Sequence, residues 1–594
     1  MSRTAEIPFL LTIPWLRRNY GERQITPEQV IQTIIERAEN DTAKNIWVTR
    51  PDLSFIQPYL DQLKDLPLES HPLWGIPFAI KDNIDLAGVK TTAGCPDFAY
   101  LPSEHATVVG NLIRAGAIPV GKANLDQFAT GLVGTRSPYG EVHNALKDEL
   151  ISGGSSAGSA VAVARGQAAF ALGTDTAGSG RVPAALNHLI GFKSSIGAWS
   201  TRGLVPACAS LDCITVFAHS VAEAETVDRS ARSYDPECAW SRSIPEPASR
   251  QPKKILLPRQ ALHFFGPFKD EYEAAWHTSM QMIQQLGLPI ERIDNTFFTN
   301  IARLLYDGPF VAERWADLGP FVEAHPGSSF PVTEKILRSG AKPAYTASLL
   351  FDNLHQLAAA KQKVKALLQN AVFITPTAGG TWTRAQVDAD PVRTNSEMGE
   401  YTNHCNLLDL CAISVPAFDA DDHLPFGVTV FASADHEDYL LGMAAQIEQS
   451  VSETEFQETA DAAGKETVQI AVCGLHMRGF ALESQLQTHR AHFVRESATA
   501  EKYSLYRLNT QPEKPGLVKS GTGGRSIQLE LWTIPLSELG SFATSIPSPL
   551  GIGKVELNDG REVPGFICEP YGAKAGTDIS EFGGWRSYVR TMEK

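Results

Sequence analysis

Two glycine-rich turns carry the serines that could do chemistry in this chain. The first turn holds Ser155 and the second holds Ser179, 24 residues later. The residues between them predict one short helix followed by one strand, which would carry the chain out and back. Because glycine permits tight turns and close backbone approach, the N–H groups of residues 176–179 can point toward one place and stabilise an oxyanion. We therefore expect the two turns to meet at a nucleophilic site.

A serine hydroxyl is a weak nucleophile and needs a general base. No histidine lies in this stretch before His188, so the base should be another group. Upstream, residues 75–82 predict a short apolar strand that ends on Lys81. A lysine desolvated among apolar neighbours can have its pKa lowered enough to be neutral and basic. Lys81 is the candidate base.

A glycine-rich phosphate loop is the alternative interpretation of the same stretch. Such loops end in Gly-Lys-Ser/Thr, or carry G-x-G-x-x-G between a strand and a helix. Residues 153–181 contain neither pattern. The composition of the turns therefore favours nucleophilic catalysis over phosphate binding.

Three motifs together resemble the amidase signature family. They are GIPFAIKDNID at 75–85, GGSSAGSA at 153–160 and ALGTDTAGSGRVPA at 171–184. Two glycines of the family pattern are replaced here, by Ala157 and Ala177. Both side chains are small enough to be compatible with the catalytic mechanism of the family. The resemblance implies an α/β fold with a central mixed β-sheet flanked by helices.

The resemblance also implies a catalytic triad. Ser179 corresponds to the nucleophile, Ser155 to a relay serine that follows a cis peptide bond, and Lys81 to the base. The implied oxyanion hole consists of the backbone amides of Thr176, Ala177, Gly178 and Ser179. No metal or organic cofactor is expected for such a cycle.

The elements that must position these residues follow from periodicity and capping. Helical and strand patterns alternate, which favours an α/β layer with a partly parallel sheet. Thr26 begins a helix with Pro27 at its first position and Gln29 placed to close a capping box. The other expected elements are helices at 106–115 and 156–165, and strands at 117–121, 168–173, 372–376 and 426–431.

Three further residues are candidates for binding substrate. Gly131 lies in an irregular polar stretch, where the family places a backbone contact to substrate; a plain surface loop is the alternative. Tyr306 and Arg314 are eight residues apart, about two helical turns, so one helix could present both on one face. A guanidinium can clamp a carboxylate with two hydrogen bonds. In the allophanate hydrolase branch of the family, a tyrosine and an arginine at this spacing hold the substrate carboxylate. The alternative is that both residues lie on a solvent-exposed helix face without a binding role.

The domain organisation changes near residue 450. Residues 1–449 carry the amidase-like motifs, and residues 450–467 are acidic without a sustained apolar period, which is typical of a linker or a weak helix. Residues 468–594 predict a small α+β or barrel-like domain. Its expected strands are at 468–473, 503–508, 526–534, 554–557 and 565–569.

This C-terminal segment resembles the C-terminal domain of allophanate hydrolases, itself similar to γ-glutamyl cyclotransferase folds. Its glycine-rich turn after Cys473 is followed directly by His476 and Arg478. We hypothesise that His476, aided by Arg478 or Arg586, assists decarboxylation of the product of the amidase step. A purely structural histidine is the alternative.

Composition restricts the class of protein further. With 594 residues the chain is too long for one ordinary core. Its net charge of −15 argues against general nucleic-acid binding. The eight cysteines are scattered, without C-x-x-C or zinc-type spacing, and no segment reaches the about 18 apolar residues of a membrane span. We expect a cytoplasmic protein without membrane or nucleic-acid partners and, by resemblance only, a homodimer.

The resemblance therefore implies hydrolysis of allophanate, through N-carboxycarbamate, to ammonia and carbon dioxide. One alternative is a general amidase, or an amidotransferase component that requires partner subunits. Another is a non-catalytic scaffold or metabolite sensor on the same fold. Activity of the purified chain alone would exclude the amidotransferase component, and covalent labelling of Ser179 would exclude the scaffold.

Overall fold

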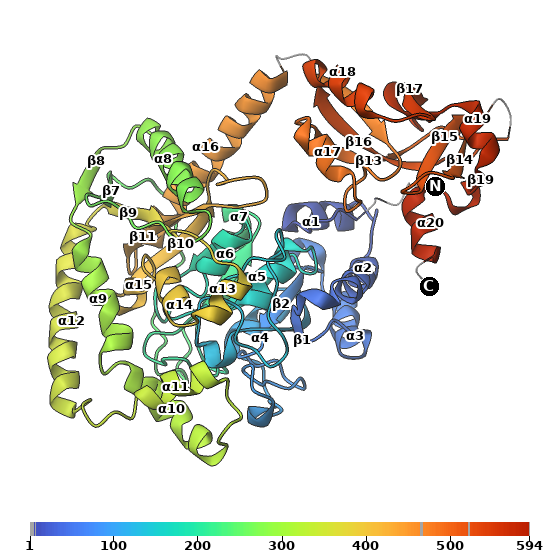
Figure 1. Cartoon of the computed structure of the whole chain (residues 1–594). Coiled ribbons are helices and arrows are strands. Elements are labelled where there is room, and N and C mark those ends of the chain that lie inside the picture. Colours follow the sequence, from blue (N-terminus) through green and yellow to red (C-terminus); the bar gives the residue numbers. More distant parts are fainter. Residues whose placement is uncertain (1–4, 6, 464–466, 521–522, 593–594) are drawn as a thin grey trace. The chain divides into compact units, whose positions relative to one another are not determined.

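The chain forms two compact units. The computed structural model describes residue 5 and residues 7–463, 467–520 and 523–592. Contacts divide the chain into Met1–Val451 and Ser452–Lys594 (Figure 1). Most of the segment expected to be a linker is helical, because α16 (Glu437–Ala463) continues through it; residues 464–466 lie outside the described residues.

In the first unit the described residues build one mixed sheet of eleven strands. Strand β2 pairs in parallel with β3 and β4, and β7 pairs in parallel with β8 and β9, whereas the other neighbours are antiparallel. In spatial order the strands are β1 (Trp47–Thr49), β3 (Ile118–Ala123), β2 (Pro77–Lys81), β4 (Phe170–Asp175), β6 (Cys213–Ala218), β5 (Ile190–Lys193), β10 (Leu410–Pro416), β11 (Gly427–Ser433), β9 (Ala371–Pro376), β7 (Lys254–Pro258) and β8 (Ile290–Ile293). The expected mixed sheet is confirmed.

The middle of this sheet is buried on both faces. Every residue of β2, β3 and β4 is buried. This explains their nearly continuous apolar sequences, since strands covered on both sides need no polar face. Because β2 and β4 are parallel, with Ile80 opposite Leu172, their carboxyl ends meet at one edge of the sheet. That edge holds Lys81 and Thr174.

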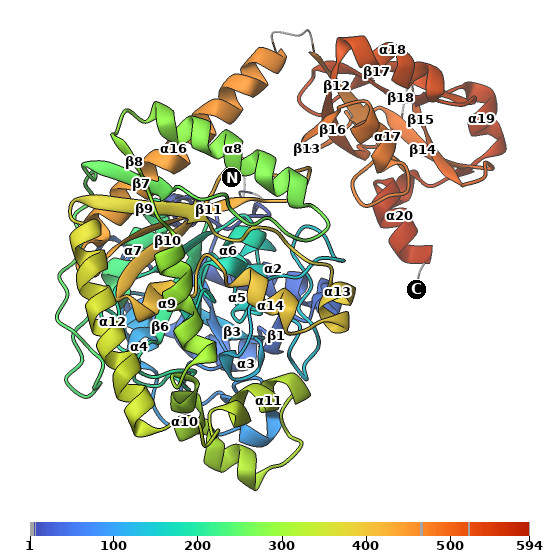
Figure 2. The same ribbon diagram turned by 60° about the vertical axis from the view of Figure 1, so that its left-hand side comes forward.

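Helices cover the sheet on both sides (Figures 1 and 2). The helices of the first unit are α1 (Ile13–Gly21), α2 (Pro27–Asn40), α3 (Leu53–Gln62), α4 (Thr107–Arg114), α5 (Ala157–Ala164), α6 (Val182–Leu186), α7 (Val221–Ala231), α8 (Lys269–Gln285), α9 (Thr296–Asp307), α10 (Val311–Ala324), α11 (Pro331–Ser339), α12 (Ala347–Leu367), α13 (Arg384–Ala389), α14 (Arg393–Met398) and α15 (His404–Leu407), and α16 begins in this unit. The capping box expected at Thr26 is present, because its hydroxyl accepts from the N–H of Gln29 and the Gln29 side chain accepts from the N–H of Thr26. Helices α9 and α12 lie side by side in both views.

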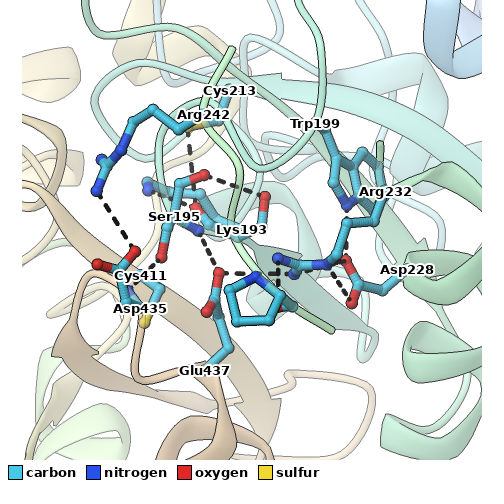
Figure 3. A network of polar contacts seen from close by, with 12 residues as sticks. Lys193, Ser195, Trp199, Cys213, Asp228, Arg232, Arg242, Cys411, Asp435 and Glu437 are labelled. Atoms are coloured by element: carbon cyan, nitrogen blue, oxygen red, sulfur yellow. Dashed lines mark hydrogen bonds and ion pairs between the residues drawn. The ribbon is translucent and has the colours of Figure 1, made fainter. Parts of the chain in front are cut away.

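A buried polar network joins α7 to the start of α16 (Figure 3). Arg232 lies 2.9 Å from an Asp228 oxygen and 3.5 Å from a Glu437 oxygen. Asp228 also accepts from the indole N–H of Trp199, and Glu437 accepts from the backbone N–H of Ser195. One guanidinium thus balances two buried carboxylates, which ties helices far apart in sequence to the loop that follows β5.

The second unit is α+β and has its own apolar core. Its described strands form two sheets: a five-stranded sheet in the order β13 (His492–Ala498), β16 (Gln528–Pro535), β12 (Thr467–Val472), β18 (Glu562–Cys568) and β17 (Leu550–Glu556), and a three-stranded sheet in the order β15 (Lys514–Lys519), β14 (Tyr503–Leu508) and β19 (Thr577–Asp578). Its helices are α17 (Glu483–Thr488), α18 (Leu536–Ser545), α19 (Pro570–Ala575) and α20 (Trp585–Met592). The five predicted strands are present; β13, β15 and β19 were not predicted from the sequence. Across the described ranges, no helix of either unit combines the length and apolar character needed to cross a membrane.

Candidate active site

Lys81 and Ser155 are in direct contact at the edge where β2 ends. The Lys81 Nζ atom lies 2.7 Å from Ser155 Oγ and 2.6 Å from Thr174 Oγ1. Both hydroxyl-bearing residues and the lysine are buried. The peptide bond between Gly154 and Ser155 is cis, as expected. The structure therefore brings together the base and the relay serine, which are 74 residues apart in sequence.

Burial makes Lys81 suited to act as a base at neutral pH. Loss of hydration lowers the pKa of the Lys81 ammonium from 10.5 to about 7, although the charges of Asp126, Asp212 and Asp175 oppose this shift. Desolvation is the larger effect because no carboxylate among the described residues forms an ion pair with this lysine. A neutral amine has a lone pair that can accept the Ser155 proton.

Thr174 is a site residue that the sequence reasoning missed. Its hydroxyl is the second partner of Lys81, and its backbone is held by Ser156, which donates to the Thr174 carbonyl at 3.1 Å and accepts from the Thr174 N–H at 3.2 Å. The alternation of side chains along a strand could have indicated it, since Thr174 lies near the end of a strand adjacent to β2. The contact with Thr174, together with the one to Ser155, holds the amine at the end of β2.

The turn that carries Ser179 is built on a buried ion pair. Arg181 Nε lies 2.9 Å from Asp175 Oδ2, and Asp175 also accepts from the N–H groups of Gly178 and Gly180. Burial alone would raise the pKa of Asp175, but the guanidinium beside it holds that pKa below its usual value. Gly178 has a φ of +139°, and a Cβ there would lie 2.3 Å from the Thr402 hydroxyl, so the turn requires glycine at this position.

Ser179 itself is 4% exposed. In the described part of the chain, no hydrogen bond joins the Ser179 hydroxyl to Ser155 or to another group. The relay is therefore assembled from Lys81 to Ser155 in this structure, and its last link to Ser179 stays a prediction.

In the candidate oxyanion turn, one backbone N–H group already forms a hydrogen bond and three do not. The Gly178 N–H already donates to Asp175 at 2.9 Å. Among the hydrogen bonds of the described residues, none comes from the backbone N–H of Thr176, Ala177 or Ser179. These three amides are the donors that could stabilise a developing oxyanion.

Asp212 fixes the beginning of that turn. Its carboxylate accepts a hydrogen bond from the Thr176 hydroxyl and two from the N–H groups of Ala207 and Cys208. Burial raises the pKa of Asp212 to about 6, although these hydrogen bonds lower it. Asp212 was not identified from the sequence, because it lies 36 residues from Thr176 in a stretch without a motif.

Tyr306 and Arg314 do lie together, but not on one helix. Helix α9 ends at Asp307 and α10 begins at Val311, so the expectation of a single continuous helix was wrong. Gly308 interrupts the pattern, and Pro309 follows it directly. The Arg314 guanidinium nevertheless lies over the Tyr306 ring, 5.6 Å from its centre. The turn between the helices, rather than helical periodicity, brings the two side chains together.

Arg314 is a buried cation without an anionic partner in the described structure. Its side chain is 1% exposed, and Nη1 donates to the Thr130 hydroxyl at 3.0 Å. Its Nε has no hydrogen-bond partner, and no carboxylate of the described residues lies within ion-pair distance of it. Burying an unpaired charge is costly, so such a site is suited to an anionic ligand that supplies the missing charge.

Gly131 follows Thr130 and lies beside a cavity. A Cβ on Gly131 would lie 2.5 Å from an Asp126 oxygen and 3.2 Å from Arg136 Cδ, so only glycine fits there. The N–H of the next residue, Leu132, donates to Asn395, which lines a cavity of about 560 Å³. Tyr306 lines the same cavity. Of the three predicted substrate-binding residues, Tyr306 therefore lines this cavity, Gly131 is joined to its lining through Leu132, and Arg314 contacts the ring of Tyr306.

In the second unit, His476 lines a small cavity. Its Nε2 lies 2.9 Å from the Gln485 side-chain oxygen, and its ring stacks on Phe566. Burial lowers the pKa of His476, and the positive charge of Lys514, which lines the same cavity, acts in the same direction. The imidazole is therefore neutral at neutral pH.

The two arginines expected to aid His476 are engaged elsewhere. Arg478 Nε lies 3.3 Å from a carboxylate oxygen of Glu530, and Arg586 Nη2 lies 3.1 Å from the same oxygen. Glu530 is buried, so the three side chains form a tight charge cluster. Lys514 is the cation that lines the cavity with His476, and this was not predicted.

The described residues contain no group of three or more His, Cys, Asp or Glu side chains placed to hold a metal ion. All eight cysteines are free thiols, and seven of them are buried.

The fold, with the buried pair of Lys81 and Ser155, defines an amidohydrolase of the amidase class. The amidase family model matches residues 29–441, and the model for the allophanate hydrolase C-terminal domain matches residues 468–590. The chain belongs to the amidase family.

Particular relatives extend this result to both units. A urea amidolyase of Saccharomyces cerevisiae is 37% identical over the whole chain, which spans only 34% of that relative's length. A solved allophanate hydrolase of Kluyveromyces lactis is similar over 98% of this chain and 100% of its own, with 36% identity and a TM-score of 0.70. The first unit alone is also similar to a component of the Synechococcus glutamyl-tRNA(Gln) amidotransferase, at 32% identity over 65% of this chain and 85% of that relative.

Proposed function

We propose that this chain hydrolyses allophanate to ammonia and carbon dioxide through N-carboxycarbamate. The observation that carries this proposal is Arg314, a buried guanidinium without a carboxylate partner in the described structure, beside Gly131 and Tyr306. A substrate with an amide at one end and a carboxylate at the other would supply the missing charge. The likeness to a solved allophanate hydrolase over both units supports the same substrate.

In the proposed acylation step, neutral Lys81 accepts the Ser155 proton while Ser155 accepts the Ser179 proton. Ser179 Oγ attacks the amide carbonyl of allophanate, and the oxyanion is stabilised by the free amides of the turn at 176–179. The C–N bond then breaks, and ammonia leaves with a proton returned through Ser155. Each oxyanion donor of this kind is typically worth about 3 kcal/mol in the transition state.

In deacylation, water takes the place of the serine nucleophile. The same relay removes its proton, and the acyl bond to Ser179 breaks to release N-carboxycarbamate. In the second unit, we propose that His476 assists loss of carbon dioxide from this dianion: one N–C bond breaks, carbon dioxide leaves, and the nitrogen takes a proton from water to give carbamate. Carbamate then takes up a second proton and decays to ammonia and carbon dioxide.

The first test is ammonia release from allophanate by the purified chain and by Arg314→Ala. Loss of the unpaired cation should lower kcat/KM about 100-fold, mainly through KM. Equal loss of activity on an uncharged amide such as biuret would instead show that Arg314 serves only the fold. Activity of the purified chain without added partner proteins would exclude the amidotransferase alternative.

The second test concerns His476 and uses the full chain. Truncation near residue 450 would cut through α16, so His476→Ala is the better variant. The first ammonia should appear at the wild-type rate, whereas carbon dioxide should appear late. Simultaneous release of both at wild-type rates would make His476 a structural residue.

Two wider properties belong to the same proposal. We propose a homodimer, by family resemblance, which light scattering of the purified chain would test. A cytoplasmic location is supported by the eight unpaired thiols, since buried free cysteines persist in reducing compartments.

A further inference from the structure

A second buried arginine lies beside the candidate carboxylate site. Arg136 is 2% exposed and lines the 560 Å³ cavity that Tyr306 also lines. Arg136 lies in the loop after Gly131, and no sequence motif indicated it. Like Arg314, it is buried, and burying a charge is costly unless a partner compensates it.

Arg136 is held by carbonyl groups and forms no ion pair with a carboxylate of the described residues. Its guanidinium donates to two carbonyl oxygens, those of Thr130 at 3.0 Å and Pro391 at 2.6 Å, and its Nε has no partner. No carboxylate in the described part of the chain is within ion-pair distance of it. Carbonyl dipoles hold a guanidinium in place but do not cancel its charge.

Asp126 is a carboxylate whose charge acts on Arg136. Its two oxygens accept from backbone N–H groups, those of Val133, Gly134 and Arg136 itself. The carboxylate is therefore committed to the backbone of the loop. Burial lowers the pKa of Arg136, although the charge of Asp126 opposes this shift.

Arg136 and Arg314 converge on one residue. Arg136 Nη1 donates to the Thr130 carbonyl, and Arg314 Nη1 donates to the Thr130 hydroxyl, both at 3.0 Å. Two guanidinium groups, neither in an ion pair with a carboxylate of the described residues, thus contact Thr130, directly before Gly131. Opposite charges attract, so an anion bound beside Thr130 would interact favourably with both cations.

We propose that Arg136 is a second specificity-determining cation, which acts with Arg314 to select a substrate that carries a carboxylate. The inference rests on the proposed function, because allophanate is the carboxylate-bearing amide in question. Thr130 is the positioning residue that sets the separation of the two cations.

The test compares an anionic with an uncharged substrate. For Arg136→Gln we expect kcat/KM on allophanate to fall about 30-fold, while kcat/KM on biuret changes less than about threefold. Arg136→Lys keeps the charge and should recover part of the preference for allophanate. Because glutamine can still donate to the Thr130 and Pro391 carbonyls, the loop should remain in place.

Arg303→Gln is the matched control. Arg303 lines the same cavity but is exposed, so solvent screens its charge and the substrate preference should not change. An equal loss on both substrates in Arg136→Gln, or no loss on either, would overturn the inference. Wild-type protein that does not hydrolyse allophanate at all would instead overturn the proposed function, so the two failures are distinguishable.

Discussion

The hydroxyl of Thr176 donates a hydrogen bond to the buried carboxylate of Asp212. This contact fixes the first residue of the turn whose free amides are the candidate oxyanion donors. The same carboxylate accepts from two backbone N–H groups of the loop at 207–210. In that loop the side chains of Cys208 and Ser210 donate to Glu313, which precedes Arg314 in sequence. The oxyanion turn and the carboxylate site are thus joined through one short chain of hydrogen bonds.

Loss of the Thr176 hydroxyl should therefore lower kcat more than it raises KM. Thr176→Val removes the donor without changing the size of the side chain, and we expect kcat to fall by about 10- to 100-fold. Thr176→Ser keeps the hydroxyl and should stay close to wild type. Steady-state kinetics of both variants decide this, and equal effects of valine and serine would contradict it.

The nucleophilicity of Ser179 should follow the ionisation of Lys81. Since burial lowers the pKa of Lys81 to about 7, the neutral base predominates above this pH and disappears below it. The rate of Ser179 labelling by a fluorophosphonate should rise with pH, with a midpoint near 7 and a plateau above. A midpoint close to the ordinary lysine pKa of 10.5 would mean that Lys81 stays charged.

Lys81→Met should abolish labelling and yet stabilise the fold at neutral pH. The folded pKa of about 7 lies below the ordinary value of 10.5, so between these values the unfolded chain binds more protons. Stability of the wild type consequently rises with pH across that window, and the cost of the buried amine is largest below pH 7. This linkage gives a cost of about 4 kcal/mol at about pH 7, and loss of the contacts with Ser155 and Thr174 offsets part of the gain from removing the amine. We therefore expect a net gain of about 2 kcal/mol at about pH 7 in urea denaturation, shrinking toward about pH 10. A variant less stable than wild type at neutral pH would contradict this.

Removal of Arg232 should destabilise the first unit strongly. Arg232→Met leaves Asp228 and Glu437 buried without their common cation, at a cost of about 3 to 5 kcal/mol (Figure 3). Arg229→Met is the matched control, because Arg229 lies on α7 but is more than half exposed, and it should change stability by about 0.5 kcal/mol or less. Denaturant midpoints of the two variants give the comparison.

Local patterns in the chain were sufficient for several features. Glycine and serine in two turns, an apolar strand ending on Lys81 and the capping box at Thr26 are short-range signals, because backbone freedom, side-chain alternation and capping act within a few residues. They correctly indicated β2, α5 and β4. The pairing of Lys81 with Ser155 was implied by the resemblance to the amidase signature family rather than by these local signals.

Packing between distant segments decided the rest. Thr174, Asp212 and Arg136 acquire their roles from partners brought close by the sheet and the loops, and no periodicity records such partners. The break between α9 and α10, and the capture of Arg478 and Arg586 by Glu530, were likewise not predictable from spacing alone. A buried charged side chain needs a partner, and the tertiary fold decides which groups lie close enough to be that partner.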